Sequence, residues 1–179
     1  MRIIAVADTH LQEWQVPKKL IELMESADLI VHAGDFVSQE IYEKFSDFDL
    51  VAVKGDNDDL KLLERLPEVA KFSVGDLKIG VVHNGNYLNL FDDLIYRAME
   101  LDVDLLIFGH IHRFVFEKLK NKAILCPGSP TEPRMSFASC AEIFIDGKEV
   151  EVKCHLVQPI FCSFGGESLE NTGWRKKCL

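Results

Sequence analysis

Short apolar runs alternate with helical patterns through the first half of the chain. Three near-continuous apolar runs, each ending on an aspartate, lie at Arg2–Asp8, Leu29–Asp35 and Leu50–Asp56. Runs of this length are typical of strands that are buried on both faces of a parallel sheet. One helical face between the first two runs is formed by Leu20, Ile21, Leu23, Met24 and Ala27. A second helix can begin at Ser38, so the pattern predicts a parallel sheet flanked by helices.

The second half changes to hairpin patterns. Residues 71–84 predict a hairpin around Gly75-Asp76 whose second strand ends at His83. A helical stripe follows, formed by Phe91, Leu94, Ile95, Ala98 and Met99. After the apolar run 104–110, four further runs predict consecutive antiparallel strands: 113–119, 122–128, 141–147 and 149–157. Asn121 and Asp146–Lys148 are the expected hairpin corners.

The chain shows no internal repeat and no linker composition. Its 179 residues suit one domain with a real core, which we expect to span residues 1–160. The segment Ser163–Leu179 has three glycines and few apolar residues, so we expect a loosely ordered C-terminal tail.

Charge and cysteine content narrow the function classes. The net charge of −9 argues against sequence-independent binding to a nucleic-acid duplex, which uses Lys and Arg. The five cysteines are odd in number and lack a C-x-x-C spacing, so they predict neither a disulfide framework nor a zinc ribbon. No apolar run has the roughly 18 residues of a membrane span, and the N-terminus lacks signal-peptide features. We therefore expect a cytoplasmic protein.

Aspartates and histidines gather where predicted strands end. Seven such residues occur there: Asp8, His10, Asp35, Asp56, His83, His110 and His112. Open α/β sheets bind ligands outside the carboxyl ends of their strands. We therefore expect the seven side chains to meet along one edge of one sheet. By contrast, His32 lies within a strand and His155 lies in the late hairpins, so both are expected to be structural.

Each motif alone has an ordinary structural interpretation. Asp8-Thr9-His10 also suits a helix N-cap region, and the Gly-Asp pairs also suit turns. The combination is more specific, because carboxylates and imidazoles suit Mn²⁺, Fe²⁺ or Zn²⁺. Seven ligands that share one carboxylate can hold two ions. Two ions form a clamp for in-line displacement at phosphorus and lower the pKa of a bound water to about 7.

Taken together, the motifs resemble the signature of the calcineurin-like metallophosphoesterases, which is Asp-x-His, Gly-Asp, Gly-Asn-x-Asp (here with Asp56 in place of the asparagine), a lone His and Gly-His-x-His. The likeness runs from Ile3 to Arg134 and includes the segment Cys126–Arg134, CPGSPTEPR. The chain looks most similar to the small, single-domain YfcE-type phosphodiesterase branch, whose fold the retromer scaffold subunit shares. The resemblance implies a single-domain α/β protein with a four-layer α/β/β/α sandwich. It also implies a hydrolase in which a metal-bridging hydroxide attacks the phosphorus of a phosphodiester in line.

The resemblance assigns metal roles by position. It implies that Asp8, His10 and His112 hold the first ion, that Asp35 bridges, and that Asp56, His83 and His110 hold the second ion. The catalytic roles it implies fall on Asp35, Asn57, Asp58 and His83, and substrate binding on Asn57, Asn84 and Arg134. The cofactors would be two divalent ions, with Mn²⁺ as the first choice and Ni²⁺, Fe²⁺ or Zn²⁺ as alternatives.

Three positions depart from the family pattern. Asp56 replaces the usual asparagine, so two divalent ions, three aspartates and a hydroxide sum to zero charge. This neutral sum predicts a preference for singly charged phosphodiesters and a tightly held second metal. Asn57 replaces the histidine that assists the leaving group in some members, which predicts a preference for activated aryl esters. The stretch His83–Asn86 departs from the usual His-Gly-His.

Two other functions remain open. A non-catalytic scaffold of the same fold would bind protein partners, and an aspartate at the position of Asp56 also occurs in that branch. A DNA-repair nuclease would need extra DNA-binding regions, for which this acidic chain offers no candidate. Antiparallel edge strands near the C-terminus could pair two chains into a homo-oligomer. Gly109 is expected to let the backbone turn, so that His110 and His112 reach different ions.

Overall fold

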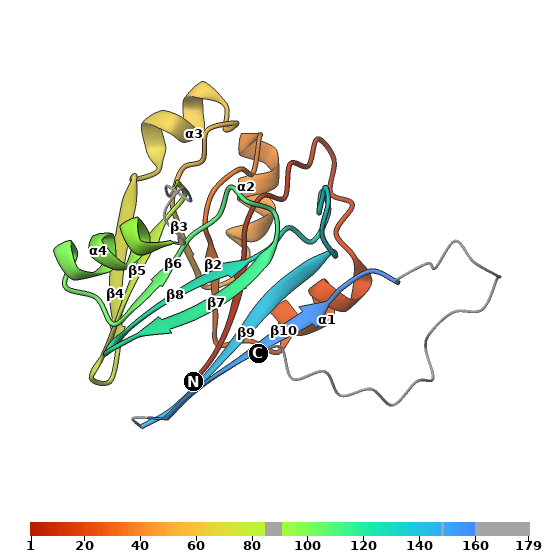
Figure 1. Cartoon of the computed structure of the whole chain (residues 1–179). Coiled ribbons are helices and arrows are strands. Elements are labelled where there is room, and N and C mark those ends of the chain that lie inside the picture. The colour runs from red at the N-terminus through yellow and green to blue at the C-terminus, as the bar shows by residue number, and fades with distance from the viewer. Residues whose placement is uncertain (85–90, 148, 160–179) are drawn as a thin grey trace.

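The computed structural model describes residues 1–84, 91–147 and 149–159 (Figure 1). The strands in these ranges are β1 (Arg2–Val6), β2 (Leu29–His32), β3 (Leu50–Ala52), β4 (Val69–Val74), β5 (Leu77–Val82), β6 (Leu105–Ile107), β7 (Phe114–Leu119), β8 (Lys122–Pro127), β9 (Ser139–Asp146) and β10 (Glu149–Leu156). The helices are α1 (Lys18–Glu25), α2 (Gln39–Phe45), α3 (Leu60–Arg65) and α4 (Asp92–Glu100). The predicted domain end at residue 160 and the predicted tail Ser163–Leu179 lie outside the described residues.

The strands form two five-stranded mixed sheets, ordered β10-β9-β1-β2-β3 and β4-β5-β6-β8-β7. The pairs β1–β2 and β2–β3 are parallel, as the apolar runs predicted. The hairpin β4–β5 turns after Val74, which confirms the predicted corner at Gly75-Asp76.

The four C-terminal strands are not consecutive neighbours, which corrects the prediction. The hairpins β7–β8 and β9–β10 are present. However, β8 pairs in parallel with β6, and β9 crosses to the other sheet beside β1. A turn motif and the alternation of its strands fix a local hairpin, but the partner on the far side of each hairpin depends on tertiary burial.

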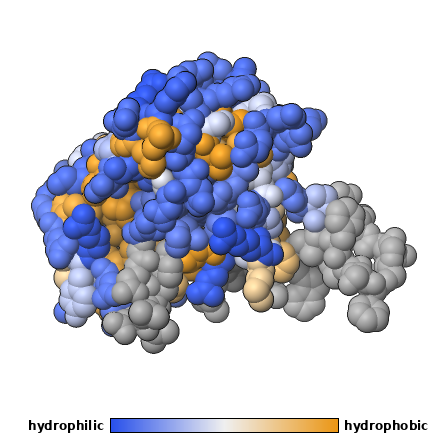
Figure 2. Space-filling view, turned by 90° about the horizontal axis from the view of Figure 1, so that it is seen from above, coloured by the Kyte–Doolittle hydropathy of each residue, from blue (hydrophilic) through white to orange (hydrophobic). Residues whose placement is uncertain are grey.

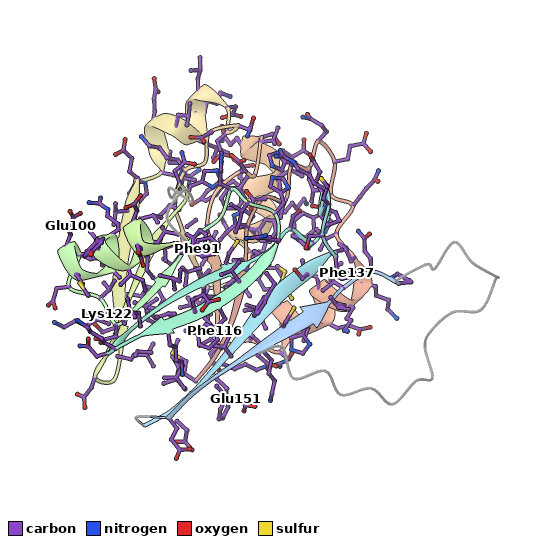
Figure 3. All side chains as sticks on the ribbon, in the orientation of Figure 1. Phe91, Glu100, Phe116, Lys122, Phe137 and Glu151 are labelled. Carbon is purple, nitrogen blue, oxygen red and sulfur yellow. The ribbon has the colours of Figure 1, made fainter. Side chains whose placement is uncertain are left out.

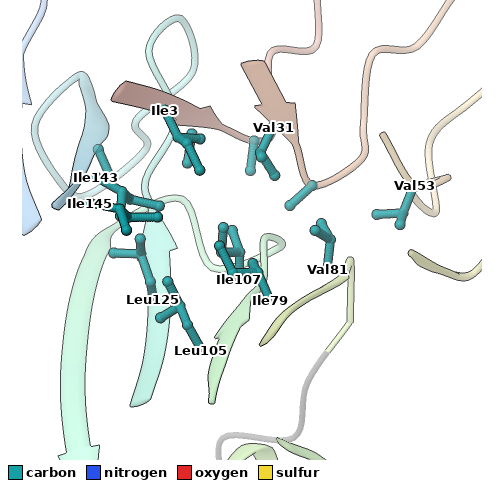
Figure 4. Close-up of a cluster of buried hydrophobic side chains, with 14 residues drawn as sticks. Ile3, Val31, Val53, Ile79, Val81, Leu105, Ile107, Leu125, Ile143 and Ile145 are labelled. Atoms are coloured by element: carbon teal, nitrogen blue, oxygen red, sulfur yellow. The ribbon is translucent and has the colours of Figure 1, made fainter. Parts of the chain in front are cut away.

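Three apolar clusters define four layers. Ile3, Val31, Ile79, Ile107 and Ile143 belong to the cluster between the two sheets (Figure 4). A second cluster packs α1, α2 and α3 against the outer face of the first sheet. A third packs α4 against the outer face of the second sheet. These clusters confirm the predicted α/β/β/α sandwich in a single domain.

Local sequence explains where the helices begin. The Ser38 side chain accepts a hydrogen bond from the Ile41 backbone N–H, which confirms the predicted start of α2. Asp59, which the sequence analysis passed over, caps α3 and also accepts from Gln39 N–H at the start of α2. The stripe on α4 is confirmed at its centre, but Met99 is 40% exposed because it lies beyond the face that meets the sheet.

The carboxyl ends of β1, β2 and β3 point toward the top of Figure 1. The face seen from above is mostly hydrophilic, with smaller apolar areas between the hydrophilic side chains (Figure 2). Among the described residues, no helix has the length and apolar character needed to cross a membrane.

Candidate metal centre

All seven predicted ligands meet at one end of the molecule, but they come from both sheets. Asp8 and His10 follow β1, Asp35 follows β2, Asp56 follows β3, His83 follows β5, and His110 and His112 follow β6. The prediction of one edge of one sheet is therefore wrong. The parallel strands β5 and β6 lie in the second sheet, and that sheet packs face to face on the first. Five strand ends consequently face a shared site across the gap between the sheets.

Three overlapping groups of side chains could each hold a metal ion. Within each group the potential ligand atoms lie within 4.8 Å of one another. The groups are Asp8, His10 and His112; Asp56, His83 and His110; and Asp8, Asp35 and His83. The first two groups coincide with the sets predicted for the two ions. The third group joins the other two, because it shares Asp8 with the first and His83 with the second.

Asp35 lies between the two histidine sets. Its Oδ2 atom is 3.3 Å from His10 Nε2 and 3.4 Å from His83 Nε2. The same His10 Nε2 atom also lies 3.3 Å from His112 Nε2. A carboxylate oxygen with imidazole nitrogens on either side is placed to serve two ions at once.

Backbone carbonyls fix the orientation of two of the histidines. His83 Nδ1 lies 2.7 Å from the Ala33 carbonyl oxygen, and His112 Nδ1 lies 2.5 Å from the Glu132 carbonyl oxygen. A carbonyl only accepts, so each Nδ1 carries a proton and donates. The Nε2 atom of each ring is then turned toward the site, which is the usual arrangement behind a metal-binding histidine.

Buried polar atoms at the centre fit a cation. Asp8 Oδ2 and His83 Nε2 are buried without a hydrogen-bond partner among the described residues. Burial raises the pKa of Asp8 to about 7, although the charge of His83 opposes the rise. Burial disfavours the charged form of His83, but the nearby carboxylate charge of Asp35, 3.4 Å from His83 Nε2, outweighs it and raises the pKa of His83 to about 9. A divalent cation would compensate these carboxylates and displace the His83 proton.

The backbone at the site is strained. Asp8, His10, Asp35, His110 and His112 have φ values of 55°, 44°, 63°, 72° and 56°. This left-handed region costs a non-glycine residue roughly 1–2 kcal/mol. Five of the seven predicted ligands adopt it, and such strain persists where the surrounding structure enforces it at functional sites.

Three glycines let the ligand loops approach one another. A Cβ atom on Gly55 would collide with the backbone N and Oδ1 of Asp35. One on Gly34 would lie 2.7 Å from His83 Nδ1, and one on Gly109 would lie 2.7 Å from the Ala33 carbonyl oxygen. Gly109 therefore permits close packing at the turn that we expected there, and the left-handed backbone of that turn lies at His110.

The two residues after Asp56 support the site in different ways. Asn57 donates two hydrogen bonds to Asp35, one from its backbone N and one from its Nδ2, and both are 2.8 Å long. Burial alone would raise the pKa of Asp35, but His83 and these two bonds outweigh it and hold that pKa well below its usual range. Asp58 accepts from the backbone N–H groups of Val37 at 2.8 Å and Gly55 at 2.7 Å. Asp58 thus ties together the loops that carry Asp35 and Asp56.

The predicted substrate-binding residues lie on opposite sides of the site. Asn84 Nδ2 donates to both carboxylate oxygens of Asp56, at 2.7 and 2.8 Å. The Arg134 side chain is 57% exposed, and its Nε atom lies 3.5 Å from Glu132 Oε1.

The two histidines that were expected to be structural lie outside the ligand groups. His32 is buried against Phe36 with its Nε2 3.2 Å from Thr9 Oγ1, and His155 pairs with Glu142 on the β9–β10 hairpin.

One supporting segment was missed as a functional element. Ser129 Oγ donates to the Asp8 carbonyl at 2.7 Å and accepts from Glu132 N at 2.8 Å. Thr131 Oγ1 donates to the Thr9 carbonyl. The segment CPGSPTEPR, noted only as part of the resemblance, therefore braces the first ligand loop and places the Glu132 carbonyl behind His112.

Comparison with known proteins agrees with this geometry. Residues 1–146 match the calcineurin-like phosphoesterase superfamily domain, and the chain belongs to this superfamily. A probable metallophosphoesterase from Methanocaldococcus jannaschii is 35% identical over 83% of this chain and 78% of its own length. A phosphodiesterase from the same organism is 28% identical over 72% of this chain and 83% of its own length.

Solved structures share the fold at lower identity. Vps29 from Chaetomium thermophilum has a TM-score of 0.74 at 21% identity, covering 87% of this chain and 95% of its own. Vps29 from Entamoeba histolytica, solved with Zn²⁺, has a TM-score of 0.68 at 24% identity, covering 87% and 97%. An archaeal phosphodiesterase has a TM-score of 0.68 at 22% identity, covering 87% and 100%.

Proposed function

We propose that this chain is a dinuclear metal-dependent phosphodiesterase, a hydrolase acting on small phosphodiesters. The observation that carries the proposal is that the three ligand groups are contiguous, because they share Asp8 and His83. The Asp35 carboxylate lies between His10 of one group and His83 of another. The superfamily match and a phosphodiesterase among the relatives support it. The donor set of carboxylates and imidazoles suits Mn²⁺ as the first choice, with Ni²⁺, Fe²⁺ or Zn²⁺ as alternatives.

The ligands of the two proposed ions differ in how exposed they are. Asp8, His10 and His112 would hold one ion at the buried end, whereas Asp56 and His110, with exposed side chains of 49% and 44%, would hold the other at the open end. Bound divalent ions would supply hydroxide at neutral pH and neutralise charge on the reacting phosphate. The open end is therefore the side from which a phosphodiester can approach.

The surrounding residues would orient the substrate. Arg134 and Asn84 flank the ligands and can donate hydrogen bonds to phosphate oxygens. Asp58 acts indirectly by holding the backbone of Gly55 and Val37. Asn57 acts on Asp35, and an amide has no proton to give to a leaving group. We therefore propose that departure of the leaving group depends on its own stability as an anion.

A scaffold that binds protein partners is the second candidate. Met135 is fully exposed, and Phe137, labelled in Figure 3 on the loop before β9, is 57% exposed. Two exposed apolar side chains on one loop near the site suit a contact with another protein. The same exposure does not by itself exclude catalysis, so activity decides between the two candidates.

The test is hydrolysis of bis-p-nitrophenyl phosphate by protein stripped with EDTA and then supplied with Mn²⁺. We expect metal-restored activity in the wild type and a loss of at least about 100-fold in Asp35→Asn. Asp76→Asn is the matched control, because it makes the same charge change in the exposed β4–β5 turn. Absence of activity with each of Mn²⁺, Ni²⁺, Zn²⁺ and Fe²⁺ would favour the scaffold.

We also propose a cytoplasmic location, on the odd cysteine number. Among the described residues, Cys126 and Cys140 are buried with free thiols, which agrees with a reducing compartment. The edge strand β10 could pair two copies of the chain, and sedimentation would test this.

A further inference from the structure

We infer that a cavity beside Asp56 is a subsite for a second anionic group on the non-reacting part of the substrate. The inference rests on the proposed function and narrows its substrate class to small phosphodiesters that carry an additional phosphate. The cavity has a volume of about 440 Å³, within the range of small-molecule sites. Asp56, His83 and Asn84 line it, so it opens directly onto the exposed end of the metal centre.

The residues that line the cavity also include two cations and several apolar side chains. Lys54 precedes Asp56 on the loop after β3, and Arg97 lies in the last turn of α4. Leu63, Val69 and Val82 supply the apolar part of the wall. The Lys54 backbone N–H donates to the Pro67 carbonyl, which fixes the loop that presents this lysine. The two cations thus come from separate elements and line the same space.

Among the described residues, each cation is paired with an exposed acid. Lys54 Nζ lies 3.1 Å from Glu68 Oε1, and the Glu68 side chain is 79% exposed. Arg97 pairs at 3.0 Å with Glu100, which is 66% exposed on the outside of α4 (Figure 3). Exposed ion pairs contribute little to stability, whereas a phosphate binds Lys and Arg through short charge-assisted bonds. A substrate phosphate can therefore displace both acids.

The lining also argues against a nucleobase as the main occupant. Bases bind to proteins largely by stacking on aromatic rings, and among the described lining residues the one aromatic ring is His83, which is expected to hold a metal ion. The neutral charge expected at the metal centre strengthens the argument. A centre without net charge gives a second phosphate little attraction, so Lys54 and Arg97 are the groups able to recognise it.

Two matched chromogenic substrates test the subsite. One is the p-nitrophenyl ester of thymidine 5′-phosphate, and the other is the same diester with an additional 3′-phosphate. We expect the additional phosphate to lower KM by about tenfold in the wild type, as for one or two charge-assisted contacts. In Lys54→Met/Arg97→Met the ratio of the two KM values should fall to near one. A ratio taken within one enzyme cancels losses of folding or metal loading.

A variant that is expected to increase the preference for the additional phosphate provides a second test. Glu68→Gln removes the acid that competes for Lys54, so the preference for the additional phosphate should rise by about threefold. Lys118→Met removes one positive charge from the β7 strand, away from the cavity lining, and should leave the ratio unchanged. Equal KM values in the wild type, or a ratio that survives the double variant, would overturn the subsite.

Direct binding separates this inference from the proposed function. Calorimetry should show that thymidine 3′,5′-bisphosphate binds the Mn²⁺-loaded protein about tenfold more tightly than thymidine 5′-phosphate does. If this difference is present while every diester resists hydrolysis, the subsite stands and the phosphodiesterase does not. If diesters are hydrolysed but the two ligands bind equally, the reverse holds.

Discussion

Asn57 holds the carboxylate of Asp35 at both oxygens. Its backbone N–H donates to Oδ1 and its side-chain amide donates to Oδ2, and both distances are 2.8 Å. The two bonds stabilise the ionised carboxylate and fix its orientation between His10 and His83. Asn57 therefore positions the carboxylate that we propose as the bridge between two ions, a role that its place in the sequence motif did not reveal.

Replacing this asparagine should weaken metal binding. Asn57→Ala keeps the backbone bond but removes the bond to Oδ2, and loss of such a supporting contact typically costs 10- to 100-fold in metal affinity. Titration calorimetry with Mn²⁺ on EDTA-stripped protein measures the change. Asn121→Ala, in the exposed turn between β7 and β8, is the control and should bind as the wild type does. Unchanged affinity in Asn57→Ala would remove this role.

Asp56→Asn should change both selectivity and metal affinity. The substitution removes one negative charge from the open end, where Asp56 Oδ2 lies 3.4 Å from His110 Nδ1. We expect the second ion to bind more weakly and the ratio of monoester to diester hydrolysis to rise roughly three- to tenfold. Paired assays with p-nitrophenyl phosphate and its bis ester, at saturating Mn²⁺, give the ratio.

The control for this charge change is Asp76→Asn, at the exposed turn of the β4–β5 hairpin. If both variants shift the ratio equally, the cause is the overall charge of the protein. If neither shifts it, the neutral-site argument fails.

Rates should depend steeply on the leaving group. The Asn57 amide is turned toward Asp35, so it provides no acid for the departing oxygen. General-acid assistance is worth roughly 10²–10⁴-fold where it is present. A series of phosphodiesters with leaving groups from nitrophenol to simple alcohols should therefore lose activity progressively as the leaving-group pKa rises. A flat series would indicate a proton donor elsewhere at the site.

Gly55→Ala should damage the centre through packing alone. The added Cβ would collide with the Asp35 backbone N and carboxylate, which cannot move without breaking the bonds from Asn57. Overpacking of this kind costs about 1–3 kcal/mol of stability, and we expect Mn²⁺ binding to fall with it. Urea unfolding and calorimetry report the two effects. Gly75→Asn is the control, because that turn is open and asparagine tolerates its φ of 56°.

An ion-pair network on the outer face of the first sheet should make stability depend on pH. Burial opposes ionisation of Glu142, but hydrogen bonds from His155 and Arg2 outweigh it and lower the pKa of Glu142. A lowered folded-state pKa means that the stabilisation is complete above the unfolded-state value and is lost as pH falls through the folded-state value. Glu142→Gln should therefore cost about 1 kcal/mol at pH 7 and progressively less in acid.

Urea unfolding of the wild type and Glu142→Gln between pH 7 and pH 3 measures this difference. Glu151→Gln is the matched control, because Glu151 is 61% exposed and its partner among the described residues is the nearby Lys153. A stability difference that stays constant with pH would assign the effect to packing and not to charge.

The sequence by itself determined the elements and the ligand set. The three apolar runs predicted parallel strands, because continuous apolar composition is typical of strands buried on both faces. The Ser38 cap predicted a helix start and Gly75-Asp76 predicted a hairpin, because each of these depends on interactions among residues near in the chain. The ligand groups of the structure coincide with the residues named from strand ends and from the family resemblance. The strand-end positions selected the seven residues, and the family resemblance divided them between two ions.

Only the tertiary structure decided how those elements combine. It split the predicted single edge between two sheets, sent β9 across to β1, and placed left-handed backbone at His110, next to Gly109. It also directed the Asn57 amide onto Asp35 and set Lys54 and Arg97 around one cavity. These outcomes depend on contacts between segments far apart in the chain. Such contacts are selected by the joint burial of two apolar faces, and no local pattern encodes which faces will meet.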